Sequence, residues 1–573
     1  MRYLRMLTNT AIGATLVALY LTIVVLQINP RFSIGGLPGL AVTLILSYGL
    51  HAAAAFYVLV VLRQLLSAEV ISPGWISFRF LVWLSTLASA IGALLMWANR
   101  RSFAAVMDGD AVRRMTGGAI ALTSCAFICA VLLVNYRLRR RRKSTVSTAA
   151  LAVTVLASVA VPLTLRGPGT GQLMPATWPA PGPQPVAGGP TTRVTLVLLE
   201  GASLDVIIPA AASGRLPNFS RLLDDGASMH LASVRPTQPA TVWTSACTGK
   251  LPYRNGIRSA ASYWPAWSRD GLELLPDYCF AHALVRFGLL GQRVHTSLDR
   301  TARPIWAILS GQGVPVGLVN WSTTHPARPV HGYIVTDRFE AAEASPVELE
   351  GSDAVWPRDA IPLVSSVISS RPDPGEPLDP RLVTPCRADR LHERVSAELD
   401  RVWPARFRAV RYECIDAAGH YFLRYARPEA FGDVSDDEVL QHGSVLLNQY
   451  LAADDMVGRE VTALRPGDLL LVVSGFGMEP LGVGKRLLER LFGNPELSGT
   501  HEGAPDGFLL AYGSLVKPGH YPRASVVDLT PTVLYYLGLP VGRDMDGYAR
   551  ADLFARDLTA ARPITFIPSY EGR

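Results

Sequence analysis

The pattern of apolar and polar positions changes once along the chain of 573 residues, near residue 166. Before that point the chain holds five long apolar runs almost free of charge, separated by short charged loops. About 20 apolar residues cross the hydrocarbon core of a bilayer, and the first run approaches that length when Leu7–Thr10 are included. Five such runs in succession predict a bundle of five transmembrane helices over residues 1–166, rather than buried core helices or a cleaved signal peptide. The runs are Ala11–Leu26, Leu37–Leu62, Phe80–Ala98, Gly117–Asn135 and Thr148–Leu165.

The basic residues between the runs predict the orientation of this bundle. Arg137–Lys143 is a dense basic cluster between the fourth and fifth runs, and such clusters favour the cytoplasmic side. Placing it there also puts Arg2, Arg5 and Arg63 inside, whereas the loop 99–116 with its four Arg lies outside. We therefore expect a multi-pass protein of the cell membrane with a cytoplasmic N-terminus and an extracytoplasmic C-terminal part. The net charge of +7 is then a topology signal and indicates no nucleic-acid partner.

A different pattern follows the fifth run. Residues 167–192 are rich in Pro and Gly, and such a segment serves as a semi-extended tether because it cannot build a core. Over residues 193–573 short apolar strands alternate with amphipathic helices, which is typical of a mostly parallel α/β sheet. The candidate strands are Val194–Leu199, Val314–Val319, Ala409–Ile415, Leu469–Ser474 and Gly507–Ala511, and the helices between them include Leu216–Asp224, Ile305–Gln312 and Gly443–Leu464.

Acidic and His residues stand near the predicted carboxyl ends of these strands, where reactive groups gather in open α/β sheets. Asp416 and His420 are four residues apart beyond one strand, and His501 precedes another strand. Carboxylate and imidazole are common ligands of Zn²⁺ and Mn²⁺. The three residues are therefore predicted to hold one divalent cation, with a coordination position left for water or substrate.

Several motifs in residues 193–573 resemble the alkaline phosphatase superfamily, in its type I phosphodiesterase/nucleotide pyrophosphatase branch. An opening strand, turn and helix lead to a Thr-Gly turn at Thr248. The sequences ECIDAAGHYF and LLLVVSGFGMEP stand at the places of its Asp-x-x-x-His and Ser-Asp-His-Gly motifs. A segment similar to the family's C-terminal part reads ASVVDLTPTVLYYLGLPVGRDMDGYARADLF. The resemblance implies an alkaline-phosphatase-like three-layer α/β/α domain that hydrolyses phosphate esters.

The resemblance also implies two metal ions beside a Ser or Thr nucleophile. By motif match the first metal is held by Asp416, His420 and His501, which are all retained. The second takes a carboxylate after the first strand, here Glu200, and two groups of the Ser-Asp-His-Gly motif. Neither of those two positions offers a ligating side chain here, so one bound ion is expected rather than two. The two positions are Gly475 and Phe476.

The nucleophile position departs from the family as well. Counting back from Thr248 gives Pro239, which has no hydroxyl. Thr237 and Thr241, two residues to either side, are candidate substitutes if the loop follows a different path. Two functions stay open. One is a hydrolase that activates water at its single metal; the other is a catalytically silent protein that serves as a binding or scaffold module of the cell envelope.

The predicted location bears on the substrate and on the cysteines. An active enzyme here would cleave a phosphate ester of a lipid head group, a nucleotide or a glycan, with the lipid bilayer as its permanent partner. Oxidising conditions outside the cytoplasm permit a disulfide such as Cys279–Cys386. By the resemblance, the insert at about 340–406 stands where the family carries a cap that sets substrate choice.

Overall fold

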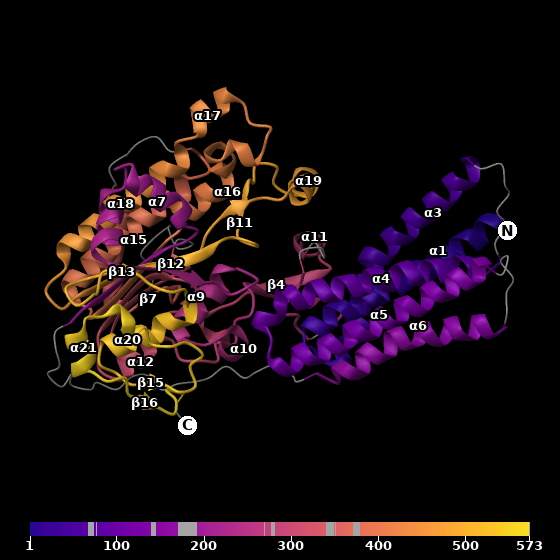
Figure 1. Ribbon diagram of the computed structural model, residues 1–573, viewed down its shortest axis with the longest axis horizontal. Coiled ribbons are helices and arrows are strands. Elements are labelled where there is room, and N and C mark those ends of the chain that lie inside the picture. The colour runs from indigo at the N-terminus through magenta and orange to yellow at the C-terminus, as the bar shows by residue number, and fades with distance from the viewer. Residues whose placement is uncertain are drawn as a thin grey trace. The chain divides into compact units, whose positions relative to one another are not determined.

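Each of the five apolar runs forms a helical stretch long and apolar enough to cross a membrane in the computed structural model of the chain (Figure 1). The second run is not one regular helix, because a π-helical segment at Ile45–Gly49 joins α2 to α3. The helices of this part are α1 (Arg2–Ile28), α2 (Leu37–Leu44), α3 (Leu50–Leu66), α4 (Phe78–Phe103), α5 (Gly109–Leu138) and α6 (Thr145–Arg166).

The chain divides into two compact units. The helical unit is Met1–Met174 with Ala261–Val294, and the α/β unit is Pro175–Ala260 with His295–Arg573. Most of the predicted tether lies outside the described residues. The described residues are 1–66, 74, 75, 77–138, 145–169, 192–268, 270–276, 281–339, 349, 351–370 and 379–571.

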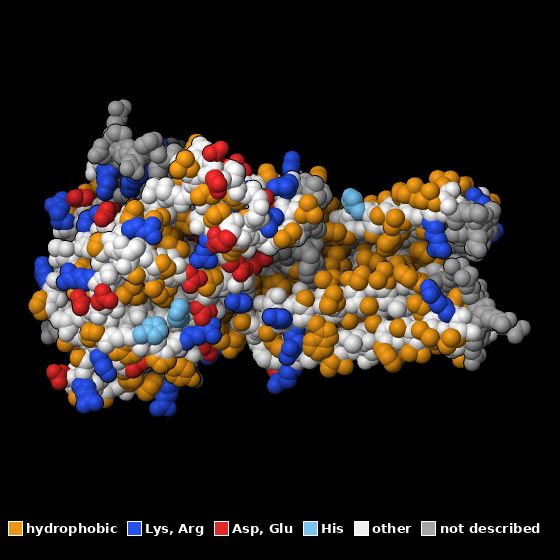
Figure 2. Space-filling model, turned by 45° about the horizontal axis from the view of Figure 1, so that its top comes forward, with side chains coloured by type: hydrophobic (Ala, Val, Ile, Leu, Met, Phe, Trp, Pro, Cys, Tyr) orange, Lys and Arg blue, Asp and Glu red, His pale blue; other side chains and the backbone are white. Residues whose placement is uncertain are grey.

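Hydrophobic side chains are numerous over the helical surface that Figure 2 shows, and Lys and Arg side chains lie mainly near its two ends. The side chains of Leu94, Phe127 and Leu156, for example, are each about 70% exposed. A large contiguous apolar surface is unfavourable in contact with water and favourable in contact with lipid. The outer face of the helices therefore agrees with their predicted place in a bilayer.

The last residue of α6 closes the C-terminal end of α1. The Arg166 side chain is buried, and its Nε donates a hydrogen bond to the carbonyl of Leu26 at 2.9 Å. Its Nη2 donates to the carbonyls of Asn29, at 2.8 Å, and Phe32. The final carbonyls of a helix have no partner within that helix, and a buried carbonyl without a partner destabilises the fold. Arg166 supplies these partners from a helix distant in the sequence.

The α/β unit is built on a ten-stranded sheet in the order β13-β2-β12-β9-β1-β8-β5-β6-β7, with β14 beside β2. Among the described strands, β12 runs antiparallel to both neighbours and β7 to β6, and the other pairs are parallel. The mostly parallel α/β class is therefore confirmed. The sheet strands are β1 (Val194–Leu199), β2 (Ala227–Ala232), β5 (Val316–Trp321), β6 (Gly332–Thr336), β7 (Val355–Trp356), β8 (Phe407–Tyr412), β9 (Leu469–Phe476), β12 (Asp506–Tyr512), β13 (Gly519–His520) and β14 (Ala524–Ser525).

Two predicted strands are displaced by their neighbours in the sequence. β5 begins two residues after Val314, because Pro315 has no N–H for the strand ladder. β8 ends at Tyr412 rather than at Ile415, because a helix begins at Cys414. The other three predicted strands agree with the structure to within two residues.

Helices cover both faces of the sheet (Figure 1). On one face α7, α15, α16 and α18 share a hydrophobic core with the strands, in which Phe422 and Val457 have no exposed surface. On the other face lie α9, α12 and α20. The described part of the insert at 340–406 forms the edge strand β7 and the helices α14 and α15, and α15 packs against β5 and β8. The helices are α7 (Leu204–Ala212), α8 (Pro217–Asp225), α9 (Pro239–Thr248), α10 (Pro252–Asn255), α12 (Ile305–Gly311), α14 (Ile361–Ser369), α15 (Val383–Val402), α16 (Cys414–Ala426), α17 (Asp436–His442), α18 (Val445–Ala463), α19 (Val483–Phe492), α20 (Leu529–Tyr536) and α21 (Arg556–Ala561).

A disulfide joins Cys386 of α15 to Cys414, the first residue of α16. The pairing with Cys279 given as an example from the sequence is therefore wrong, and Cys279 lies outside the described residues. The Cα atoms of Cys386 and Cys414 are 4.7 Å apart because α15 and α16 pack together. The disulfide thus fixes the start of the helix that carries Asp416 two residues later.

Candidate metal centre

The carboxyl ends of neighbouring parallel strands frame the candidate centre. β1 lies between β8 and β9, parallel to both. Glu200 directly follows β1, Asp416 lies in the first turn of α16 after β8, and Gly477 directly follows β9. His501 follows the short strand β11 (Gly499–Thr500), which pairs with β10 (Glu479–Pro480). Parallel strands deliver their following residues to one edge of the sheet, so distant parts of the sequence meet here.

Asp416, His420 and His501 converge on a common point. Asp416 and His420 lie four residues apart on α16, and therefore on the same face of the helix. His501 Nε2 lies 3.1 Å from Asp416 Oδ1, and His420 Nε2 lies 3.5 Å from Asp416 Oδ2. The two Nε2 atoms are 3.0 Å apart, and the three ligand atoms all lie within 4.8 Å of one another. The structure therefore brings together the three residues that the sequence predicted as ligands.

The other nitrogen of each imidazole contacts a backbone carbonyl. His420 Nδ1 lies 2.9 Å from the carbonyl of Gly499, and His501 Nδ1 lies 3.4 Å from that of Gly477. A carbonyl only accepts hydrogen bonds, so these contacts favour the tautomer with the proton on Nδ1 and a lone pair on Nε2. Outer partners of this kind orient metal-binding His residues. Two facing lone pairs repel each other unless a cation lies between them.

The Asp416 carboxylate adds to the need for a cation. Its Oδ1 is buried and makes no hydrogen bond of good geometry among the described residues. The three side chains are 11–28% exposed, so a ligand can reach them from solvent. One carboxylate and two imidazoles with free lone pairs fit a Zn²⁺ or Mn²⁺ ion.

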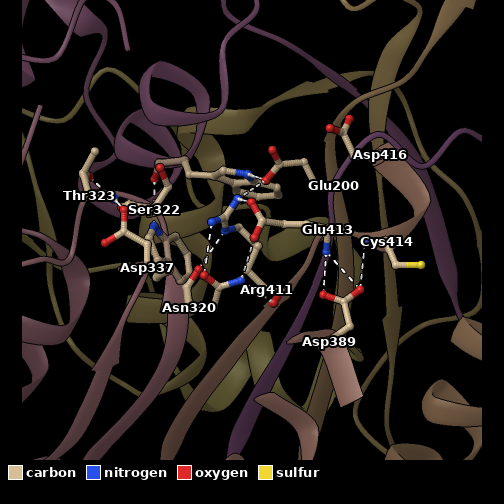
Figure 3. A network of polar contacts seen from close by, with 12 residues as sticks. Glu200, Asn320, Ser322, Thr323, Asp337, Asp389, Arg411, Glu413, Cys414 and Asp416 are labelled. Carbon is tan, nitrogen blue, oxygen red and sulfur yellow. Dashed lines mark hydrogen bonds and ion pairs between the residues drawn. The ribbon is translucent and has the colours of Figure 1, made fainter. Parts of the chain in front are cut away.

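Glu200 does not join this cluster, because its carboxylate is held by a buried guanidinium. Figure 3 shows the Arg411 side chain between the carboxylates of Glu200 and Glu413. Arg411 Nη1 donates to Glu200 Oε2 and to Glu413 Oε1, each at 2.5 Å, and its Nε donates to the carbonyl of Asn320 at 2.7 Å. Trp243 Nε1 donates to Glu200 Oε2 at 3.0 Å. The expected second-metal carboxylate is thus already neutralised by the chain itself.

Burial acts against both charges of the Glu200–Arg411 pair. It raises the pKa of the Glu200 carboxyl to about 7, an effect that the Arg411 charge opposes. Burial also disfavours the guanidinium charge, but Glu413 and Glu200 together raise the pKa of Arg411 above its ordinary value. Arg411 therefore stays cationic at the end of β8.

Apolar groups fill the positions of the two missing ligands. A Cβ placed on Gly475 would lie 2.5 Å from Val242 Cγ1, so α9 occupies the space that a side chain there would need. Phe476 has no exposed surface, and its ring packs against the imidazole of His501 with centroids 4.6 Å apart. These two residues support the walls of the centre and contribute no oxygen or nitrogen ligand from their side chains.

The predicted substitutes for the nucleophile lie at the start of α9. Pro239 is the first residue of that helix, Thr237 precedes it and Thr241 lies in its first turn. Thr241 is fully buried, and its hydroxyl makes no hydrogen bond within the described part of the chain. Thr237 is 8% exposed. Thr241 cannot meet a substrate without movement of α9, and Thr237 presents little surface to one.

The sequence pattern did not predict the network around Arg411. The available signal was a charged residue inside the apolar stretch Ala409–Ile415, since a charge in a buried strand requires a partner. The contact of Arg411 with Asn320 follows from the pairing of β5 with β8, and the contact of Glu200 with Trp243 follows from the packing of α9; no local pattern encodes either.

The sheet, its two helical layers and the convergent Asp and His residues define a mostly parallel α/β architecture with a candidate metal centre at one edge of the sheet. The family model of type I phosphodiesterase / nucleotide pyrophosphatase matches residues 194–528, which is more than half of the chain. The chain belongs to this family.

Solved structures show a limited likeness. Murine ectonucleotide pyrophosphatase / phosphodiesterase 5 is 13% identical with a TM-score of 0.38, and the match covers 64% of this chain and 100% of that chain. The human protein is 14% identical with the same TM-score, covering 63% and 100%. An inactive variant of the murine protein in complex with AMP is 12% identical with a TM-score of 0.38, covering 64% and 100%. No curated protein matches the chain.

Proposed function

We propose that this membrane-anchored phosphodiesterase-family protein binds one divalent cation through Asp416, His420 and His501 and hydrolyses a phosphate ester there. The observation that carries the proposal is the approach of two imidazole Nε2 atoms to 3.0 Å beside a buried carboxylate oxygen. When bound, such a cation polarises a phosphoryl oxygen and lowers the pKa of a coordinated water to about 7. Three protein ligands leave a coordination position for that purpose.

The residues of the chain favour one cation over two. Arg411 supplies a fixed positive charge to Glu200, so this carboxylate has no need of a metal. Val242 and Phe476 occupy the neighbouring volume with apolar groups. Zn²⁺ and Mn²⁺ are the expected ions.

Hydrolysis at this centre proceeds without a covalent enzyme intermediate, because Pro239 has no hydroxyl and both Thr237 and Thr241 are buried. Water attacks phosphorus directly and loses one proton to solvent, the bond from phosphorus to the leaving oxygen breaks, and the leaving oxygen takes up a proton from solvent. His420 and His501 are oriented by their contacts with the carbonyls of Gly499 and Gly477.

A second candidate function is binding of a phosphate-bearing ligand without turnover. The filled positions at Gly475 and Phe476 favour it, since phosphoryl transfer depends on electrostatic stabilisation that a second cation would otherwise supply. Both candidates need the same bound ion. They differ in whether the bound ester is cleaved.

We also propose on which side of the membrane each part of the chain lies. Residues 1–166 would span the membrane five times with the N-terminus in the cytoplasm, and residues 167–192 would tether the 193–573 domain on the outer side. The Cys386–Cys414 disulfide supports an oxidising compartment for that domain. A substrate would then be the phosphate ester of a lipid head group, a nucleotide or a glycan outside the cytoplasm.

Elemental analysis and activity of the detergent-solubilised full chain test the proposal together. We expect one equivalent of Zn or Mn, and cleavage of a chromogenic phosphodiester or monoester that stops in Asp416→Ala and His501→Ala. His230→Ala is the matched control, because His230 is exposed and lies on β2 outside the cluster. One equivalent of metal without turnover of any ester would establish the binding function instead. Absence of bound metal in the wild-type protein would overturn both functions.

A further inference from the structure

A segment within the family-matched range packs with the membrane helices. Ala261–Val294 lies between residues of the α/β unit in the sequence, yet it belongs to the helical unit. Its ends form an antiparallel hairpin of β3 (Ala261–Pro265) and β4 (Leu290–Val294), and α11 (Ala281–Arg286) lies between them. We call residues 261–294 the docking hairpin.

An apolar residue anchors the docking hairpin to the helices. Leu272 has no exposed surface, and Tyr263 and Leu275 of the hairpin are packed around the same cluster. The cluster therefore lies where α1 ends and α2 begins. The buried members from the helical part are Val25, Leu26, Phe32, Leu40 and Leu44.

A buried amide side chain makes this contact specific. Asn29, at the C-terminal end of α1, is 1% exposed. Its Nδ2 donates to the carbonyl of Leu274 at 2.7 Å, and its Oδ1 accepts from the N–H groups of Leu274, at 2.8 Å, and Glu273, at 2.9 Å. The amide thus pairs with the hairpin as a neighbouring strand would. A buried polar group is costly when unpaired, so this arrangement favours one docking register.

Charged and polar groups extend the contact beyond α1. Arg31 Nη1 forms an ion pair with Glu273 Oε1 at 2.9 Å, and both side chains are at most 15% exposed. Ser33 donates a hydrogen bond to Asp270. Because water is largely excluded, the Arg31–Glu273 ion pair is stronger than an ion pair on an open surface.

Two glycines let the hairpin approach the helices closely. A Cβ on Gly39 of α2 would lie 2.5 Å from the backbone carbonyl oxygen of Trp267. A Cβ on Gly36 would lie 2.6 Å from Asp270 Oδ2. At neighbouring Gly35, by contrast, a Cβ would meet only Ser33 Oγ, at 3.4 Å. Absence of side chains at positions 36 and 39 is therefore a requirement of the docked hairpin.

We propose that the five-helix unit is a docking receptor for residues 261–294, which holds the phosphodiesterase-family domain to the helices independently of the 167–192 tether. The helices then do more than anchor the chain in lipid. The partner is a segment of the same chain, recognised by the Asn29 amide, the Arg31 charge and the apolar cluster around Leu272. Cutting the tether would leave the two parts of the chain associated.

The test is cleavage of the tether in the full-length protein. A protease site is placed within residues 170–191, an affinity tag precedes Met1, and the detergent-solubilised protein is cut and washed on the affinity resin. We expect the C-terminal fragment to stay bound to the tagged helices. Release of the wild-type fragment at the first wash would overturn the proposal.

Substitutions in the helical part separate docking from general damage. Gly39→Ala should lower the ratio of retained to released fragment by about tenfold or more, because the added Cβ meets a backbone atom that cannot move freely. Alanine improves helix propensity over glycine, so weakening of α2 cannot explain the loss. Gly35→Ala is the matched control and should leave the fragment bound. Equal retention of both variants would contradict the proposal.

A charge exchange gives a second readout that misfolding cannot imitate. Arg31→Glu and Glu273→Arg should each lower retention, because each places two like charges together in the contact. The double variant should restore retention, since it recreates the opposite pair with its order reversed. Failure of the double variant to exceed either single variant would overturn the assignment of this contact as the docking interface.

Discussion

The two halves of the centre treat buried carboxylates in opposite ways. On one side Asp416 faces two imidazoles, and its Oδ1 has no hydrogen-bond partner among the described residues. On the other side Glu200 is satisfied by Arg411 and Trp243. A carboxylate near the end of a buried strand requires a positive partner in both cases. The chain supplies that partner itself in one half and leaves it to be supplied from outside in the other.

This difference explains why the losses in the family motif fall together. Because a guanidinium neutralises Glu200, a second cation is not needed beside it. Positions 475 and 476 can then be occupied by Gly475 and Phe476, whose side chains bind no metal. The same volume can then be filled by Val242 of α9. The half that holds Asp416, His420 and His501 (the retained half) keeps all three ligands. Their outer carbonyl contacts are made by Gly499 and Gly477, not by Glu200, Gly475 or Phe476 (the altered half).

Removing a ligand from the retained half should have the largest effect. Loss of an outer partner of a metal ligand lowers metal affinity by about 10–100-fold, and loss of the ligand itself should exceed that range. We expect Asp416→Ala to abolish stoichiometric metal binding in the full chain, measured by elemental analysis after dialysis. Glu200→Gln should leave the metal content unchanged, since Glu200 is bound to Arg411. A loss of metal in Glu200→Gln would break the contrast between the halves.

Removing the cation of the other half should destabilise the α/β unit instead. Arg411→Met leaves Glu200 and Glu413 without their buried partner, which costs about 3–5 kcal/mol in comparable pairs. The midpoint of unfolding, followed by tryptophan fluorescence, should fall while the metal content of the folded fraction stays at one equivalent. Arg401→Met, on the surface of α15, is the control and should change stability by less than about 0.5 kcal/mol.

A double variant identifies the origin of that destabilisation. Adding Glu200→Gln to Arg411→Met removes one of the unpaired charges, so the two effects should combine to less than their sum. Strict additivity would mean that Arg411 acts through packing and not through its charge.

The Cys386–Cys414 link should have a smaller effect on stability and should report on the retained half. It closes a loop with a sequence separation of 28 residues, for which about 3 kcal/mol of stabilisation is typical. Replacing both residues by Ser should lower stability by about that amount and weaken metal binding, because Asp416 lies two residues beyond Cys414. A reducing agent should shift the wild-type protein in the same direction and leave the variant unchanged. A variant as stable as the wild-type protein would contradict this role.

The sequence predicted the parts of the fold that local pattern encodes. Five apolar runs predicted the five candidate spans. β1 has the predicted bounds because its six largely apolar residues lie between the charged residues Arg193 and Glu200. Asp416, His420 and His501 were found because their types and spacing carry a motif. The ends of β5 and β8 were displaced, since Pro315 and the start of α16 act through geometry that hydrophobicity does not measure.

Contacts between distant segments could not be predicted in the same way. The Glu200–Arg411 pair joins residues 211 apart, and the Asn29–Leu274 contact joins residues 245 apart. Nothing in the residues around Asn29 distinguishes a docking amide from an ordinary helix end. Such contacts depend on the assembled sheet or bundle, which defines the partner only after folding.

The smallest effect is expected at Gly475, where the Val242 side chain fills the neighbouring space. Gly475→Ala places a Cβ 2.5 Å from Val242 Cγ1, and overpacking of this kind costs about 1–3 kcal/mol. Val242→Ala alone should also destabilise, because it leaves a cavity. The double variant should be more stable than the sum of the two changes predicts, since the new methyl group enters the space that the valine vacates. Denaturant unfolding of the four proteins measures this coupling, and its absence would mean that the space beside Gly475 is not closed by α9.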